Sequence, residues 1–166
     1  MTELPPGWAW MKLGDIGEWF GGGTPSKKVT EYWTNGTIPW LSPKDMVTDI
    51  LQGTTNLIST SAVENSPVRV VPAGSVAIVV RSGILERKLP VAVVPFATTL
   101  NQDMRAVVPY PGIEPKWVSH FLRMAEYRIL HSCSKNGTTV ASIETARLME
   151  QYIPIPPTAE QRRIVA

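Results

Sequence analysis

Proline and glycine occur along the whole of this chain, and they limit what it can fold into more than any other feature. The 166 residues include 15 prolines and 12 glycines, which are spread out rather than gathered into one linker. Proline lacks a backbone donor and glycine loses much backbone entropy on ordering, so both disfavour the interior of long regular elements. The sequence therefore predicts many short strands and helices joined by turns, without internal repeats or low-complexity segments.

Length and composition indicate one globular domain. A chain of 166 residues fits a single core and leaves little room for a second domain. Hydrophobic residues make up 43% of the chain and charged residues 18%, below the usual ~25%, which excludes disorder and a highly basic tail. The formal net charge of +2 permits a nucleic-acid partner without arguing for one, because local clusters of cations attract phosphate.

The sequence also indicates a compartment. The single cysteine, Cys133, has no partner for an internal disulfide. The first residues lack the basic and apolar regions of a signal peptide, and the longest apolar run, at 76–80, is far shorter than the ~18 residues that span a bilayer. We therefore expect a cytoplasmic protein with no membrane segment.

The middle of the chain is predicted to be rich in strands. Four runs of β-branched residues are each bounded by proline or glycine, which is typical of partly buried strands. They are residues 68–71, 75–80, 89–94 and 104–108. Nearer the N-terminus, residues 8–13 predict a short strand that enters a helical turn at Asp15, and the glycines at 21–23 are expected to end that helix.

The predicted helices lie in the last third of the chain. The longest begins at Pro115, which suits a first helical position, and its apolar residues recur at spacings of three and four as far as Ile129. A shorter helix is predicted at 142–149, and residues 152–157 are predicted to be extended because proline excludes its predecessor from the α region.

A final helix is predicted to begin at Thr158. Thr158 and Gln161 have the spacing of a capping box, in which each side chain bonds to the backbone of the other residue. The sequence stops at Ala166, after about two turns, whereas isolated helices below ~12–15 residues are marginal in water. We therefore expect this helix to continue in a longer protein or to be completed by a partner.

Two clusters of cations are candidates for contacts with phosphate. The glycine-rich loop at 21–28 combines backbone amides with the hydroxyls of Thr24 and Ser26 and the cations Lys27 and Lys28. It is not a nucleotide-binding P-loop, because Lys27 follows a serine instead of preceding a serine or threonine. The alternative for this loop is an ordinary solvated turn.

The second cluster follows the predicted strand at 75–80. Arg81, Ser82, Arg87 and Lys88 flank a loop from which a rigid scaffold could present cations to a DNA backbone, and the alternative is a solvated strand end.

Amide and aromatic side chains have two interpretations each. Asn101 and Gln102 could recognise an adenine edge in the major groove, or they could cap a turn. Tyr32, Trp33 and Trp40, close in sequence to the glycine-rich loop, could stack on unpaired bases, although anchoring of a core is the stronger expectation.

Catalytic interpretations find little support. A metal-dependent nuclease could be assembled from Asp103, Glu114 and Lys116, but the last two lie at a predicted helix start instead of on a strand. The two histidines and the one cysteine are too few and wrongly spaced for zinc, and no nucleophile-elbow, dinucleotide-binding or amino-methyltransferase motif is present. The sequence therefore predicts no catalytic residue and no metal ligand.

Nine short motifs follow one another along the chain. They are LPPGW at 4–8, KLGDI at 12–16, GGTPS at 22–26, YW at 32–33, IPW at 38–40, NQ at 101–102, GTT at 137–139, IPIPP at 153–157 and EQRRIV at 160–165. In this order they resemble the target recognition domain of type I restriction-modification specificity subunits, and the resemblance covers nearly the whole chain.

The resemblance implies an architecture and a role. The fold would be α+β, a compact, β-rich target recognition domain with a few short helices over residues 1–155. Residues 156–166 would form a connector and the start of a long coiled-coil spacer helix. The domain would recognise one half of a bipartite double-stranded DNA target and would not itself be catalytic.

The resemblance also implies partners. These would be methyltransferase subunits, the restriction motor subunit through the assembled complex, and a second recognition domain or a second half-subunit. S-adenosylmethionine, ATP and Mg²⁺ would be bound by those partner subunits, so no cofactor is expected in this chain.

The resemblance and the cation clusters together give a set of candidate site residues. The residues expected to bind DNA are Thr24, Ser26, Lys27, Lys28, Arg81, Ser82, Arg87 and Lys88. Those expected to contact a partner subunit or helix are Gln161, Arg162 and Arg163. Since the shared motifs would build the scaffold, specificity is expected in stretches 48–66 and 82–88, which weakens the case for Asn101 and Gln102.

Two alternatives to DNA recognition stay open. The first is a protein- or carbohydrate-interaction module that uses the tryptophans and the glycine-rich loop. The second and more distant alternative is the metal-dependent nuclease.

Overall fold

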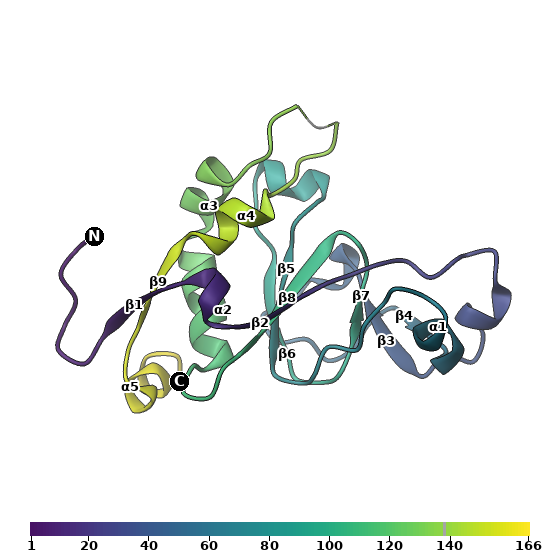
Figure 1. Cartoon of the computed structure of the whole chain (residues 1–166), viewed down its shortest axis with the longest axis horizontal. Helices are drawn as coiled ribbons and strands as arrows, with labels where there is room; N and C mark the ends of the chain where they lie inside the picture. Colours follow the sequence, from purple (N-terminus) through teal and green to yellow (C-terminus); the bar gives the residue numbers. More distant parts are fainter. Residues whose placement is uncertain (138) are drawn as a thin grey trace.

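A computed structural model describes residues 1–137 and 139–166, and short elements alternate throughout it (Figure 1). The strands are β1 (Ala9–Lys12), β2 (Gly17–Gly21), β3 (Ile38–Leu41), β4 (Asn56–Ile58), β5 (Ser75–Val79), β6 (Val91–Val94), β7 (Thr99–Leu100), β8 (Met104–Pro109) and β9 (Tyr152–Ile155). The helices are α1 (Thr60–Glu64), α2 (Pro115–Met124), α3 (Glu126–Ser132), α4 (Thr145–Met149) and α5 (Thr158–Ile164), with 3-10 turns η1 (Leu13–Asp15), η2 (Thr30–Trp33), η3 (Pro43–Asp45) and η4 (Gly83–Glu86). This confirms the α+β class and the prediction of many short strands and helices joined by turns.

The core is built on a four-stranded antiparallel sheet in the order β2–β8–β5–β6. All five residues of β5 are buried, as its β-branched, nearly continuous apolar sequence predicts. The apolar face of α2 packs against β5 and β6. The predicted strands at 75–80, 89–94 and 104–108 are thus confirmed and form most of this sheet.

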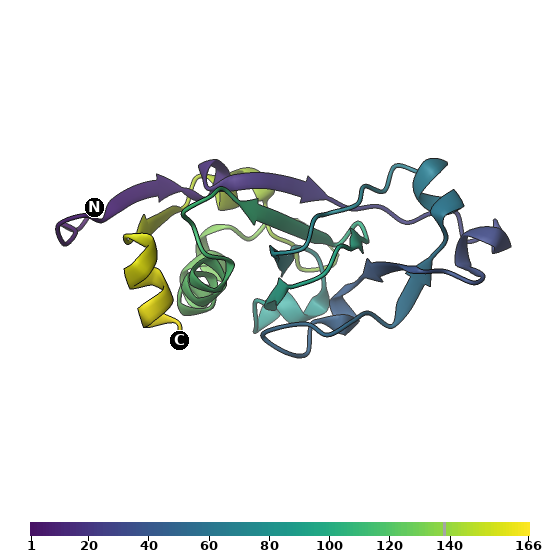
Figure 2. The ribbon, with the colours of Figure 1, turned by 90° about the horizontal axis from the view of Figure 1, so that it is seen from below.

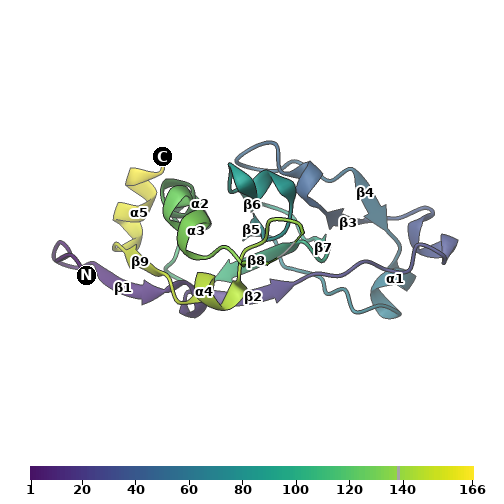
Figure 3. The same ribbon diagram turned by 90° about the horizontal axis from the view of Figure 1, so that it is seen from above.

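Two smaller sheets extend the fold along its long axis (Figure 2). On one side β1 pairs antiparallel with β9, so that Ala9 lies opposite Ile155, and α5 lies beside this pair. On the other side β3 pairs antiparallel with β4 and parallel with β7. Figure 3 shows β1, β9 and α5 at one end of the molecule and β3, β4 and α1 at the other.

The second end has a small core of its own, formed around Trp40 and Ile58. The rings of Trp33 and Trp40 meet edge to face, with centroids 5.0 Å apart and planes at 85°. The aromatic residues near the glycine-rich loop therefore anchor a core, which was the stronger of the two expectations.

Three expected elements differ in the structure. Residues 68–71 form only a single bridge, between Val71 and Thr98, instead of a strand. The helix expected from Pro115 to Ile129 divides at Ala125 into α2 and α3. The two sides of this break are tied to different loops, since the Arg123 guanidinium pairs with Asp49 while the Glu126 carboxylate accepts the backbone N–H of Leu89.

The third difference concerns the glycines at 21–23, which do not end a helix: Gly21 is the last residue of strand β2, and Gly22 and Gly23 follow it. A Cβ at Gly17 would lie 2.2 Å from the carbonyl oxygen of Val108, so this glycine allows β2 to approach β8 closely. Pairing with a strand distant in sequence therefore decides the conformation here. Among the described residues, no helix is long and apolar enough to cross a membrane.

Candidate nucleic-acid interface

The base of the glycine-rich loop is fixed to the turn between β7 and β8. The backbone N–H of Gly23 donates to the Leu100 carbonyl (2.9 Å), and the indole of Trp40 donates to the Gly23 carbonyl (3.0 Å). A Cβ at Gly22 would lie 1.9 Å from the carbonyl oxygen of Asn101, so only glycine permits this approach. The loop therefore leaves the sheet from a rigid attachment.

The tip of the same loop is open to solvent. Ser26, Lys27 and Lys28 are exposed, and the carbonyl of Ser26 accepts a hydrogen bond from the Trp33 indole (3.2 Å). Thr24 lies nearer the base, half-buried, and its hydroxyl donates to the side-chain oxygen of Gln102. The loop is thus a turn that displays two cations, and its contact with phosphate stays a prediction.

The residues of the second cation cluster, Arg81, Ser82, Arg87 and Lys88, do not lie together in one site. Arg81 is exposed at the end of β5, where it bridges to Ser142, and the half-buried Ser82 caps η4 through its hydroxyl. Arg87 and Lys88 are both exposed but line two different hollows. Arg87 lines a hollow together with residues of α3 and of the loop at 134–142, whereas Lys88 lines one beside Asp49 and the start of β6.

A hollow of about 510 Å³ lies between the end of the central sheet and the segment at 135–145. We call it the Arg105 hollow, because Arg105 of β8 lines it together with Arg81, Gln102 and Lys135. Sequence analysis missed Arg105 and Lys135, since neither lies in a cluster. The available signal for Arg105 was a single cation within the otherwise apolar run 104–108.

The side chains of Asn101 and Gln102 have different surroundings. Asn101 is buried and its side-chain oxygen accepts the backbone N–H of Asp103 (2.9 Å), so it caps the turn as the structural alternative predicts. Gln102 follows it and lines the Arg105 hollow. Only Gln102 of this pair is therefore placed to meet a ligand.

The loop that precedes β4 is held by one buried carboxylate. Asp45 accepts hydrogen bonds from the backbone N–H groups of Ser42 (2.9 Å) and Thr55 (2.8 Å) and from both of their hydroxyls. Burial raises the pKa of Asp45, but these hydrogen bonds together lower it by more, so the pKa lies below its ordinary value. The expected specificity stretch at 48–66 thus starts from a fixed framework.

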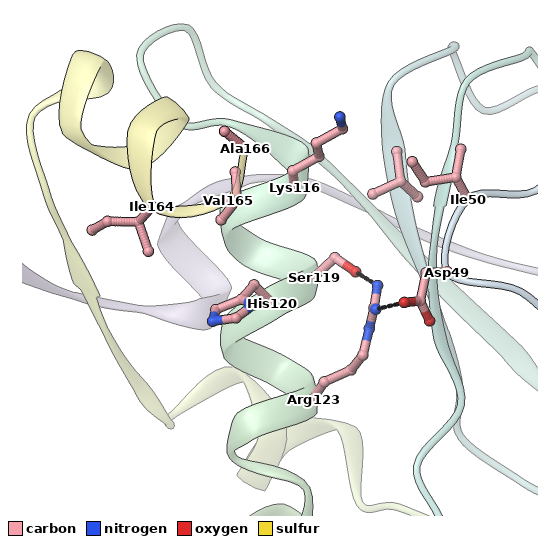
Figure 4. A pocket seen from close by; sticks show the side chains of 10 residues that line it. Asp49, Ile50, Lys116, Ser119, His120, Arg123, Ile164, Val165 and Ala166 are labelled. Atoms are coloured by element: carbon pink, nitrogen blue, oxygen red, sulfur yellow. Dashed lines mark hydrogen bonds and ion pairs between the residues drawn. The ribbon is translucent and has the colours of Figure 1, made fainter.

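A further hollow of about 320 Å³ lies between α2 and the end of α5, where it is bounded by Asp49 and Arg123 (Figure 4). Figure 4 shows the Arg123 guanidinium between the Asp49 carboxylate (2.5 Å) and the hydroxyl of Ser119. Arg123 therefore ties the loop at 46–51 to α2.

The constellation considered for a nuclease is not assembled. Asp103 and Glu114 lie beyond opposite ends of strand β8, and the Glu114 carboxylate pairs with Arg162 (2.8 Å). Within residues 1–137 and 139–166, no group of three His, Cys, Asp or Glu side chains could hold a metal ion. Cys133 is buried, and burial raises the pKa of its thiol, which keeps it protonated.

Helix α5 is fixed to the domain by Gln161, which is fully buried. The Gln161 amide donates to the carbonyls of Gly112 (2.9 Å) and Pro156 (2.8 Å), and its oxygen accepts the N–H of Glu114 (2.8 Å). The expected capping box is therefore wrong, because tertiary partners occupy this side chain, and Thr158 likewise donates to Gly112.

The burial of Gln161 leaves it no surface for the partner contact expected of it. Arg162 and Arg163 are exposed on α5 and pair with Glu114 and Glu160, at 2.8 Å and 3.5 Å. The glycine-threonine motif at 137–139 is only partly described, since Thr138 lies outside the described residues.

The sequence of this chain is similar to those of known proteins. Residues 5–166 match the family model described as type I restriction modification DNA specificity domain. The chain is 46% identical over 156 residues to the specificity subunit of the type I restriction enzyme EcoR124I/EcoR124II of Escherichia coli, covering 94% of this chain and 39% of that protein. It is 34% identical over 172 aligned residues to the MjaIX specificity subunit of Methanocaldococcus jannaschii, covering 98% and 37%.

Solved structures share the fold. The HsdS subunit of Thermoanaerobacter tengcongensis superposes with a TM-score of 0.73 at 26% identity, covering 99% of this chain and 37% of that one. A chain from a type I R-M system studied for its assembly and conformational transition gives 0.74 at 27% identity, covering 99% and 38%. The chain thus spans less than two fifths of the length of the curated relatives that it matches.

Proposed function

The chain belongs to the type I restriction modification DNA specificity domain family, and on this premise we propose that it recognises one half of a bipartite double-stranded DNA target. In this proposal it directs methyltransferase and endonuclease subunits to the target and is not itself catalytic. The curated relatives are specificity subunits, which supports a role in recognition over one in chemistry.

One observation carries the proposal, namely the way in which cations are paired. We define the basic loops as residues 22–28 and 81–88, and the connector region as β1, α4, β9 and α5. In the described structure no ion pair involves a cation of the basic loops, which are Lys27, Lys28, Arg81, Arg87 and Lys88. Each cation of the connector region is ion-paired; these are Lys12, Arg147, Arg162 and Arg163.

This difference matters because a paired cation must give up its carboxylate to bind a phosphate. An unpaired cation exchanges only water and counterions, and the release of DNA counterions favours binding. The basic loops are therefore the surface that we propose for the DNA backbone, with the hydroxyls of Thr24, Ser26 and Ser82 as additional donors.

The connector region suits assembly. We propose that α5 begins a coiled-coil spacer helix and that the exposed faces of Arg162 and Arg163 meet methyltransferase subunits. The relatives are more than twice as long as this chain, which supports a second recognition domain or half-subunit in the complex. S-adenosylmethionine, ATP and Mg²⁺ would then be held by the partner subunits, in the cytoplasm.

The test uses the complex purified with its methyltransferase. We expect its affinity for duplex DNA to fall steeply with salt, and the logarithmic slope to shrink by about 0.9 for each phosphate contact removed. The variant with alanine at Lys27, Lys28, Arg81, Arg87 and Lys88 removes the basic loops together. Binding that is absent from the wild-type complex, or a slope that the variant leaves unchanged, would overturn the proposal.

The tryptophans argue against the alternative of a carbohydrate-binding module. Every one of the six indole N–H groups donates to an acceptor within the chain, and all six side chains are buried or half-buried. A platform that stacks on sugar rings needs exposed aromatic faces, and this chain uses its tryptophans to join elements.

A further inference from the structure

The proposed function leaves open which side chains distinguish one DNA sequence from another. Exposed lysines and arginines on loops contact phosphates, which are the same in every sequence. Recognition of bases needs donors and acceptors that are held in a fixed direction. The inference below rests on the proposed DNA-binding function and concerns the Arg105 hollow.

Arg105 differs from the cations of the basic loops in its support. It lies on β8, which is paired on both sides, with Gly21 of β2 opposite it on one side and Ile78 of β5 on the other. Its guanidinium donates to the carbonyl of Met104 (2.9 Å) and packs over Gly21, where a Cβ would lie 3.6 Å from the guanidinium carbon. The arginine is therefore half-buried and directed by the sheet.

Gln102 lies in the same hollow and is also held. The hydroxyl of Thr24 donates to its side-chain oxygen, which directs the amide NH₂ group away from this contact. Thr24 belongs to the glycine-rich loop, whose base is fixed at Gly22 and Gly23. The hollow thus contains a fork of donors from Arg105 beside an oriented amide.

The charges around the hollow are positive on balance. Arg81, Arg105 and Lys135 line it, and Glu144 is the one acidic residue among the described residues of its lining. The Glu144 carboxylate pairs with Arg147 (3.1 Å), which reduces its repulsion of an approaching phosphate. Figure 1 shows the strands that support the hollow in the middle of the molecule.

We propose that Arg105 and Gln102 contact base edges in the major groove and determine specificity, while the basic loops contact the flanking phosphates. For Gln102 this replaces the expectation that the shared motif at 101–102 only builds the scaffold, because its side chain is exposed and lines the hollow beside Arg105. Arginine matches the O6 and N7 acceptors of guanine with two parallel hydrogen bonds. A glutamine amide offers one donor and one acceptor, which match the N6 and N7 groups of adenine.

The experiment measures base preference and not affinity alone. The complex with its methyltransferase is incubated with a duplex library whose target half is randomised, and bound duplexes are sequenced. For Arg105→Lys, which keeps the charge but removes the fork, we expect the preference for guanine at one position to fall by about tenfold or more. For Gln102→Ala we expect the loss at a different position.

Matched variants separate base contacts from other effects. Arg128→Lys makes the same chemical change on an exposed residue of α3 that lines a different hollow, and it controls for the loss of an arginine. Arg87→Ala is expected to weaken binding to all duplexes alike and to lower the salt slope. Thermal unfolding of each complex confirms that the variants remain folded.

The outcomes are distinguishable. A shifted preference at one base pair with Arg105→Lys supports the inference. Uniform weakening with an unchanged preference would overturn it and make Arg105 a phosphate contact, with the proposed function intact. A wild-type complex that shows no salt-dependent binding to duplex DNA would instead overturn the proposed function.

Discussion

Among the described residues, lysines and arginines are ion-paired in the connector region and unpaired in the basic loops. In the connector region the cations pair with carboxylates of the chain, as Lys12 does with Glu150 (2.7 Å). In the basic loops the cations face solvent, and no described carboxylate pairs with them. Because exposed ion pairs contribute little to stability, the difference says more about binding than about folding. It teaches that exposed cations can mark either an internal joint or a surface left open for a polyanion.

The two regions also differ in how their backbone is held. The connector region is held by buried side chains: Gln161 of α5 donates to the Gly112 carbonyl, and Trp117 of α2 donates to the carbonyl of Pro154 in β9 (2.9 Å). In the glycine-rich loop the base is fixed at Gly22 and Gly23, and the side chains of Lys27 and Lys28 at the tip are exposed. A rigid joint transmits orientation, whereas exposed side chains on an anchored loop can adjust to a ligand.

The largest effect is expected at the base of the glycine-rich loop. Gly22→Ala places a Cβ against the carbonyls of Asn101 and Leu100, so the backbone must move and the free energy of unfolding falls by about 3 kcal/mol. Urea unfolding of the chain measures this. Gly53→Ala is the control, since a Cβ there meets no atom within 4 Å. Equal losses in the two variants would show that the loop base is not fixed.

The connector region is tested by Gln161→Leu. This change keeps much of the volume but leaves the N–H of Glu114 and the carbonyl of Pro156 without their partner, at a cost of about 2–3 kcal/mol in unfolding free energy. The control is Gln52→Leu, at an exposed position. A loss below about 0.5 kcal/mol would mean that the connector region is not held by this side chain.

The loop before β4 makes stability depend on pH through Asp45. The pKa of Asp45 is lower in the folded than in the unfolded chain, so its contribution is complete above the unfolded pKa and disappears as pH falls through the folded pKa. Asp45→Asn is expected to cost about 1–2 kcal/mol at pH 7 and less near pH 3. Urea unfolding at both pH values measures the difference, and a cost that is the same at both would contradict the assignment.

The smallest effect is expected for the exposed pair of Arg163 and Glu160. The Arg163 guanidinium lies 3.5 Å from a carboxylate oxygen of Glu160, and the Arg163 side chain is 77% exposed. Arg163→Ala is therefore expected to change the free energy of unfolding by less than about 0.5 kcal/mol. The salt slope of DNA binding, measured on the purified complex, should stay near the wild-type value. A slope smaller by about 0.9 would place the connector region on the DNA and end the distinction between the two regions.

Much of the fold could be predicted because its signals are local. Runs of β-branched residues identified β5, β6 and β8, and Pro115 with its apolar spacing identified α2. Local signals failed where a distant partner decides the outcome. Residues 68–71 have a strand-like composition, but they form only one bridge, between Val71 and Thr98. Gly17 adopts a strand conformation because the backbone of β8 lies directly against it.

The candidate site shows the same division. The cations of the basic loops could be identified from the sequence because they lie close together in it, at 27–28 and 81–88.

Other parts of the site depend on residues far apart in the chain. Arg105 was missed because most of its neighbours in the hollow come from Val80 and Arg81, which follow β5, and from the segment after α3. Gln161 was predicted to complete a capping box because that is a local rule, whereas its hydrogen-bond partners lie 47–49 residues earlier and at Pro156.

The sequence by itself determined the short elements, the cations of the basic loops and the family resemblance, because these depend on residue types and their spacing. Tertiary structure alone decided which cations are neutralised, which amide is buried and that Arg105 and Gln102 share a hollow. The physical reason is that pairing and burial depend on distances in space, which the chain sets only after β2, β8 and β5 have come together.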